Sequence, residues 1–280
     1  MADDHTLVYD PPATQRDDDT GFEHYYDLHP TKEDLMGEST AQSKLIFYLL
    51  QVLEWLYRVE GWFIISNLNI YSQREFKQYP ITPDVAVFKG VVIPNLGVRS
   101  LRSWRLYEPE RPPPQVVFEI SSKETWRDDL RTKPAQYAEL GVHEYYAYDP
   151  KDPPYWPKTQ GRLCGWWREG ARMVEQTRDA QGRLWSAELA SWLAPDGTLL
   201  RLYDQDGSLR LTEGEAERVA KEAERAAKER ALAAHEAERV AKEHALAAEE
   251  AERVAKEAER AAKERAWAQL RALGVDPDEL

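Results

Sequence analysis

Carboxylates that could bind a metal ion occur in two apolar segments of the sequence. Asp84 follows Pro83 in one of them, and Glu119 lies in the middle of the other, residues 116–121. A carboxylate inside a buried strand is costly unless a partner or a cation compensates its charge. Carboxylate oxygens suit Mg²⁺ or Mn²⁺, and such an ion activates water and stabilises charge on a phosphoryl oxygen. Two carboxylates on one side of a sheet would therefore form a hard-cation site.

Three further charged residues accompany this pair. Glu38 precedes the first amphipathic segment, and Lys123 and Lys133 follow Glu119 in the sequence. A lysine beside such an ion can orient or help to deprotonate the water, or neutralise the transition state. The order of these residues along the chain, more than any one of them, indicates a metal site.

Each residue also has an ordinary structural explanation, which is favoured when the residue is taken singly. Pro-Asp often marks the entry to a strand or turn, and Glu119 could pair with an arginine. Lys133 could form a surface i,i+4 pair with Asp129, and Asp128 or Asp129 could cap a helix. Core or non-catalytic roles are expected for Tyr137, Tyr145, Tyr146, Tyr148, His143 and Cys164.

The segment around Glu119 predicts a strand. Residues 116–121 are apolar and β-branched, and three prolines precede them. Alternate side chains of a strand share a face, so Val117, Glu119 and Ser121 should point one way.

A helix and a second strand should follow. Asp129, Lys133 and Tyr137 are spaced i, i+4, i+8 and share one helical face, and Gly141 is placed to end that helix. Residues 144–148 predict the next strand, which completes a strand–helix–strand crossover.

The other expected elements are placed by the same kinds of pattern. A helix should begin at Ser39 or Thr40, because apolar residues then recur at helical spacing. Residues 62–71 and 81–88 predict strands. Residues 156–211 predict a small antiparallel meander that packs on the sheet.

Composition and charge limit the partners and the cellular compartment that can be expected for this protein. The net charge is −13, and much of it lies at the two ends: six Asp against one Arg in residues 1–20, and 18 acidic against 13 basic residues in 213–280. This argues against a broad basic surface for nucleic acid but not against a local basic groove. The single cysteine and the lack of a long apolar run or signal core predict a cytoplasmic protein without a membrane partner.

Eight consecutive heptads begin at Glu215 and contain no Gly or Pro. This composition favours one long helix, and a thin Ala/Val seam is spaced as in a coiled coil. The helix could form an oligomer, most simply a dimer, or stand alone through Glu–Lys and Glu–Arg pairs. The expected organisation is a flexible acidic tail over 1–30, a globular domain over 31–212 and a helical tail over 213–280.

The combined pattern resembles the Uma2 family (DUF820), a branch of the PD-(D/E)XK nuclease-like superfamily. The matching pieces begin with Gly37-Glu38, Pro83-Asp84 and Val117-Phe118-Glu119-Ile120-Ser121-Ser122. They continue with Asp129, Lys133, Tyr137, Gly141-Val142, Glu144-Tyr145-Tyr146, Asp149-Pro150, Leu200-Arg201-Leu202-Tyr203-Asp204 and the charged C-terminal helix.

The resemblance implies an α/β fold, with a mixed sheet flanked by helices, and Mg²⁺-dependent hydrolysis of DNA phosphodiesters. It implies Asp84, Glu119 and the Ile120 carbonyl as metal ligands, with Glu38 as a supporting acid. The lysine that the superfamily carries two residues after the strand glutamate is Ser121 here. The Uma2 pattern implies that Lys133 takes its place.

Three hypotheses about function follow. The leading one is a metal-dependent endodeoxyribonuclease whose phosphate contacts include Arg99, Arg102, Arg105 and Arg127. The second is a nucleic-acid-binding module of the same fold that has lost catalysis. The third is an assembly protein whose long helix is its working part.

Overall fold

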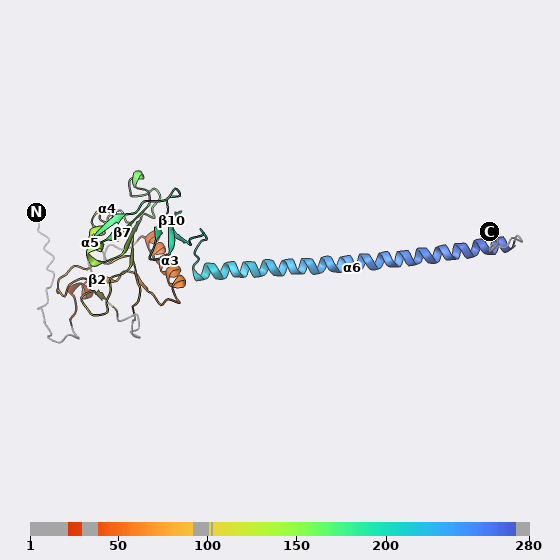
Figure 1. Ribbon diagram of the computed structural model, residues 1–280, viewed down its shortest axis with the longest axis horizontal. Coiled ribbons are helices and arrows are strands. Elements are labelled where there is room, and N and C mark those ends of the chain that lie inside the picture. The colour runs from red at the N-terminus through yellow and green to blue at the C-terminus, as the bar shows by residue number, and fades with distance from the viewer. Residues whose placement is uncertain (1–21, 30–38, 92–100, 102, 273–280) are drawn as a thin grey trace, which may run out of the picture. The chain divides into compact units, whose positions relative to one another are not determined.

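The computed structural model describes residues 22–29, 39–91, 101 and 103–272 (Figure 1). The chain divides into two compact units, Met1–Gly214 and Glu215–Leu280. Up to the crossover, the elements are α1 (Tyr25–Leu28), α3 (Thr40–Leu56), β1 (Phe63–Ile65), β2 (Asn69–Tyr71), β3 (Val85–Phe88), β4 (Ser103–Arg105) and β5 (Val116–Ile120). They continue with α4 (Trp126–Arg131), α5 (Lys133–Leu140), β6 (Glu144–Tyr148), the 3-10 helix η2 (Lys158–Gln160), β7 (Leu163–Glu169), β8 (Arg172–Glu175), β9 (Leu184–Ser186), β10 (Ser191–Asp196) and β11 (Leu199–Tyr203).

A six-stranded mixed sheet in the order β1-β3-β5-β6-β7-β8 forms the centre of the first unit. Strands β5 and β6 are parallel, and the other neighbours in this sheet are antiparallel. Helices α4 and α5 connect the parallel pair, so the predicted crossover is confirmed. Gly141 ends α5 with φ +87°, a conformation that suits glycine because it has no Cβ.

The two faces of the sheet bury different clusters, as the alternation along β5 predicts. Val116, Phe118 and Ile120 pack with α3 and with the three-stranded meander β11-β10-β9. Val117 packs on the opposite face, among residues of α5 and of the parallel pair β2–β4. Figure 1 shows α4 and α5 on one side of β7, and α3 with β10 on the other.

Four details differ from the sequence-based expectations. Residues 62–71 form two strands in different sheets, because the chain turns at Asn67, where φ is +52°. Within 81–88 only the last four residues form β3. The helix expected around Lys133 is two helices separated at Thr132. Of residues 156–211, only β9 to β11 form a meander, since β7 and β8 extend the main sheet.

The start of α3 follows the prediction. Ser39 is its N-cap, and the Ser39 hydroxyl accepts a hydrogen bond from the Gln42 N–H at 3.3 Å. Of the expected tail over 1–30, residues 22–29 are described, and His24 is buried there.

The last element is one continuous helix, α6 (Glu213–Ala272). Ion pairs between residues three or four apart occur along its surface, such as Glu238–Lys242 at 2.6 Å. Exposed large apolar side chains remain on it at Val219, Leu232, Val240, Leu246 and Val254. None of the described helices, α6 included, combines the length and apolar character needed to span a membrane.

Candidate metal and catalytic site

The strand register sets Asp84 and Glu119 opposite each other. Strands β3 and β5 are antiparallel with Val85 paired to Phe118, so the next pair along is Asp84 and Glu119. Directly opposed residues of an antiparallel pair share a face. The Ile120 N–H donates to Asp84 Oδ2 at 2.5 Å, which fixes this carboxylate against the end of β5.

Burial and a neighbouring carboxylate raise the pKa of both residues, the neighbour being Glu119 for Asp84 and Asp129 for Glu119. The pKa of Asp84 is raised well above its ordinary value, chiefly by burial and then by the Glu119 charge. The pKa of Glu119, a residue only 3 % exposed, is also raised by burial, and Lys133 partly opposes this shift. A cation beside the pair would favour the ionised form of both groups.

Two side chains of α5 hold Glu119. Lys133 Nζ lies 2.9 Å from Glu119 Oε2, and the Tyr137 hydroxyl donates to Glu119 Oε1. Lys133 and Tyr137 are one helical turn apart, so the predicted shared face is observed. Both project onto the sheet face that carries Glu119.

Asp129 completes the charged cluster from α4. Its Oδ1 atom lies 2.9 Å from Lys133 Nζ, and its Oδ2 atom accepts from the hydroxyls of Ser121 at 2.7 Å and Thr125 at 3.0 Å. The N-cap of α4 is Thr125, so the helix-capping explanation of Asp129 is wrong. Ser121, at the position where the sequence resemblance implies a lysine, is thereby linked through Asp129 to Lys133.

Lys133 is held as an ammonium ion. Burial acts to lower its pKa, but the Glu119 and Asp129 carboxylates outweigh burial and raise the pKa above that of an ordinary lysine. Its position at the first residue of α5, with Pro134 next to it, follows from the preference of proline for the first helical turn. The side chain keeps 20 % of its surface exposed.

The Ile120 carbonyl has a partner that the sequence did not reveal. Gln42 of α3 donates from Nε2 to the Ile120 oxygen at 2.7 Å, across 78 residues of sequence. A glutamine near the start of an amphipathic helix carries no signal for such a contact. Gln42 thus connects α3 to the end of β5, where the candidate ligands meet.

The remaining predicted residues are not brought into this cluster. Glu38, Arg99 and Arg102 lie outside the described residues. Arg105 pairs with Asp27 at 3.7 Å and with Glu108 at 3.3 Å. The Arg127 guanidinium stacks on the Trp126 ring at 4.3 Å, and Lys123 is exposed.

Residues set aside as non-catalytic have structural partners. His143 Nδ1 lies 2.8 Å from Glu188 Oε1, and Cys164 is buried beside Gln160 and Arg178. The tyrosines of β6 are buried as expected, and the Tyr145 hydroxyl donates to the Asp129 carbonyl at 2.7 Å.

The donor set agrees in chemistry with a hard cation. Asp84, Glu119 and the Ile120 carbonyl provide oxygen atoms at one point of the sheet, and oxygen ligands suit Mg²⁺ and Mn²⁺. Across the described ranges, no group of three or more His, Cys, Asp or Glu side chains is arranged to hold a metal ion. The described contribution is thus a carboxylate pair and a carbonyl.

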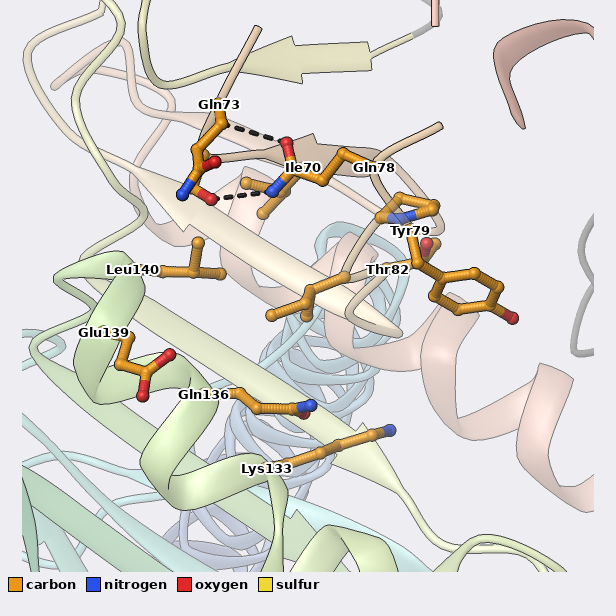
Figure 2. A pocket seen from close by; sticks show the side chains of 12 residues that line it. Ile70, Gln73, Gln78, Tyr79, Thr82, Lys133, Gln136, Glu139 and Leu140 are labelled. Carbon is orange, nitrogen blue, oxygen red and sulfur yellow. Dashed lines mark hydrogen bonds between the residues drawn. The ribbon is translucent and has the colours of Figure 1, made fainter. Parts of the chain in front are cut away.

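A cleft of about 500 Å³ opens beside Lys133. One wall is the exposed face of α5, and the other is formed by residues between Ile70 and Thr82 (Figure 2). Lys133 contacts Glu119 and also lines this cleft, so this one member of the charged cluster can be reached from the cleft.

A known protein family and a solved structure are similar to this chain. Residues 33–190 match the Uma2 family, described as "Putative restriction endonuclease". A crystal structure described as "a putative nuclease belonging to DUF820", from Anabaena variabilis ATCC 29413, matches at 11% identity and TM-score 0.38, covering 55% of this chain and 75% of that one. No curated protein matches the sequence. Since the family match spans more than half of its residues, the chain belongs to the Uma2 family of nuclease-like proteins.

Proposed function

We propose that this protein is an endonuclease that hydrolyses DNA phosphodiester bonds with Mg²⁺ or Mn²⁺. The observation that carries the proposal is the ion pair of Lys133 with Glu119, beside Asp84 and at the edge of an open cleft. Membership of a family described as "Putative restriction endonuclease" supports DNA as the substrate.

Asp84, Glu119 and the Ile120 carbonyl are the proposed metal ligands, with Glu38 as a supporting acid. A bound ion would lower the pKa of a water and stabilise negative charge on the phosphoryl oxygens. Gln42 orients the Ile120 carbonyl through its 2.7 Å hydrogen bond, and Tyr137 orients the Glu119 carboxylate.

Lys133 has the role of an ammonium donor. Because neighbouring carboxylates raise its pKa, it carries its proton at neutral pH and does not serve as a general base in this arrangement. It can orient the attacking water by donating a hydrogen bond and can neutralise charge in the transition state. Asp129 also holds the ammonium in place, since its Oδ1 atom lies 2.9 Å from Nζ.

The same proposal gives a role to each of the other segments of the chain and to the candidate arginines. Residues 31–212 form the nuclease domain, 1–30 form an acidic lead-in, and 213–280 form a tail that joins two copies into a dimer. Arg127, which is exposed on α4, remains a proposed phosphate contact, as do Arg99 and Arg102. Arg105 is weaker in this role, because it already pairs with two carboxylates.

The direct test is nicking of a supercoiled plasmid, with a single-stranded circle alongside. Wild type and Glu119→Ala are compared in Mg²⁺, Mn²⁺ and EDTA. The proposal expects cleavage that requires the metal and disappears in the variant. Cleavage that the substitution leaves unchanged would place the activity elsewhere or in a contaminant. DNA binding without cleavage by the folded wild type would favour a binding module of the same fold.

A further inference from the structure

The cleft beside Lys133 is polar but carries little charge. Beyond Lys133, its charged lining residue is Glu139, and its side-chain amides come from Gln73, Gln78 and Gln136. A second phosphate group in this space would meet the Glu139 carboxylate and be repelled. Amide groups carry both donors and acceptors, which suits the edge of an uncharged heterocycle.

The cleft is close enough to the candidate catalytic site to hold part of the same substrate. Gln136 is three residues after Lys133 on α5, a rise of about 4.5 Å along the helix. This distance compares with the spacing of neighbouring bases, about 3.4 Å along one strand. Residues three apart are also neighbours on the helix surface, so a nucleotide next to a phosphate at Lys133 can reach Gln136.

The two walls differ in how their amides are held. Gln78 is fixed, since its Oε1 accepts from the Gln73 N–H at 2.9 Å and its Nε2 donates to Ser72 Oγ at 2.7 Å. The Gln136 side-chain amide forms no hydrogen bond with the other described residues. Figure 2 shows Gln136 and Lys133 extending from α5 in the same direction, below Thr82 and Tyr79. The carbonyl oxygen and the NH₂ group of the Gln136 amide can thus both hydrogen-bond to a ligand.

An aromatic ring stands at the margin of the same cleft. Tyr79 is 49% exposed, and the edge-to-face contact with Tyr26, with ring centroids 5.1 Å apart, supports its position. An exposed aromatic ring of this kind can stack on a nucleobase, typically for about 1–3 kcal/mol per base.

We infer that this cleft binds one unpaired nucleobase next to the scissile phosphate, read by the Gln136 amide and stacked on Tyr79. The inference rests on the proposed function for the position of the phosphate. Adenine fits best, because a glutamine amide forms two hydrogen bonds with its N6 donor and N7 acceptor. The cleft volume of about 500 Å³ lies within the range of small-ligand sites, roughly 300–1,000 Å³.

Binding rather than cleavage tests this inference. Fluorescein-labelled oligonucleotides dA8, dC8 and dT8 are titrated in EDTA with the full-length protein and with Gln136→Leu, which keeps the side-chain size but removes the amide. Gln51→Leu, a change of an exposed glutamine on α3, is the matched control. Tyr79→Ala and Tyr79→Phe separate stacking from the hydroxyl.

We expect wild type and Gln51→Leu to prefer dA8, and Gln136→Leu to lose about 5- to 100-fold in affinity for dA8 alone. Tyr79→Ala should weaken binding to every oligonucleotide, whereas Tyr79→Phe should not. Equal affinities for the three oligonucleotides in wild type, or equal effects of Gln136→Leu and Gln51→Leu, would overturn the inference. Base preference without metal-dependent cleavage would preserve the base site but refute the nuclease and the scissile phosphate beside that site. Cleavage without base preference would preserve the nuclease and refute the base site.

Discussion

Lys133 Nζ lies 2.9 Å from Glu119 Oε2, and this contact joins the start of α5 to the end of β5. The same ammonium lies 2.9 Å from Asp129 Oδ1. A lysine at the start of α5 therefore reaches the strand glutamate, whereas the strand itself is followed by Ser121. Ser121, at the strand position, contributes indirectly by donating a hydrogen bond to Asp129.

Replacing Asp129 with Asn tests its role in positioning Lys133. The amide can still accept from Ser121, but the charge that holds the ammonium from one side is lost. We expect the rate of DNA cleavage to fall about 10- to 100-fold, as is typical for groups that orient a site. Single-turnover rates measured in Mg²⁺ would check this.

The matched control for Asp129→Asn is Asp128→Asn on the same helix. Asp128 is exposed and accepts from the Thr132 hydroxyl at 3.2 Å, away from Lys133. Its replacement should leave the cleavage rate unchanged and alter the unfolding free energy by less than about 0.5 kcal/mol. Equal losses of activity in the two variants would contradict the role of Asp129 in positioning Lys133.

The sequence predicted this site through its local periodicities. Alternation along 116–121 placed Glu119 on the face opposite Ile120, and the i, i+4, i+8 spacing placed Lys133 and Tyr137 together. The spacing succeeded across the break at Thr132 because α5 resumes directly at Lys133. Each of these predictions depends on residues close in sequence or on the regular geometry of a strand.

Local sequence patterns could not predict the contacts between segments that are distant in the sequence. The hydrogen bond of Gln42 to the Ile120 carbonyl depends on how α3 packs on the sheet, and no local periodicity encodes that packing. The turn at Asn67 was missed for a related reason. Residues 62–71 have the composition of one strand, yet their two halves pair with strands of different sheets.

His24 should make stability fall in mild acid. It is fully buried and stacked on Tyr71, its Nδ1 donates to the Glu75 carbonyl at 2.8 Å, and its Nε2 accepts from the Tyr107 hydroxyl. Burial lowers its pKa from 6.5, although the hydrogen bond to Glu75 opposes this.

The direction of the pH effect follows from that shift. The unfolded chain takes up a proton at His24 at a higher pH than the folded chain, so the free energy of unfolding should decrease as pH falls below 6.5. Urea unfolding at pH 7.5 and pH 5.5 measures this, and His24→Gln should show a smaller decrease than wild type. An identical decrease in the two proteins would assign the effect to other groups.

Gly165→Ala should destabilise the packing between the main sheet and the meander. The added methyl group would lie 2.7 Å from Tyr146 Cε1 and 2.8 Å from Leu184 Cδ1, closer than real contacts allow. Overpacking of this kind costs about 1–3 kcal/mol, measurable as a lower denaturant midpoint. Gly214→Ala, whose methyl group meets no atom within 4 Å, is the control and should not lower the midpoint. A Gly165→Ala midpoint equal to that of wild type would contradict the tight approach.

Deleting residues 213–280 should convert a dimer into a monomer. The large apolar side chains of α6 recur along the heptads, with valines at 219, 240 and 254, and pairing with a second copy would bury them. Sedimentation equilibrium of the full chain and of residues 1–212 measures the two masses. A monomeric mass for both would show a single helix stabilised by its own ion pairs, and retained cleavage by 1–212 would make the tail accessory.

The most direct test of the central claim is Mn²⁺ binding, followed by electron paramagnetic resonance of the free ion. Wild type, Asp84→Asn and Glu119→Gln are titrated, with Asp128→Asn as the control. If Asp84 and Glu119 hold the catalytic ion, wild type and Asp128→Asn will bind Mn²⁺ with the same affinity. The other two variants will bind at least about tenfold more weakly, a loss of about 1.4 kcal/mol. Equal Mn²⁺ affinity in all four folded proteins, or no binding by the wild type, would contradict the account.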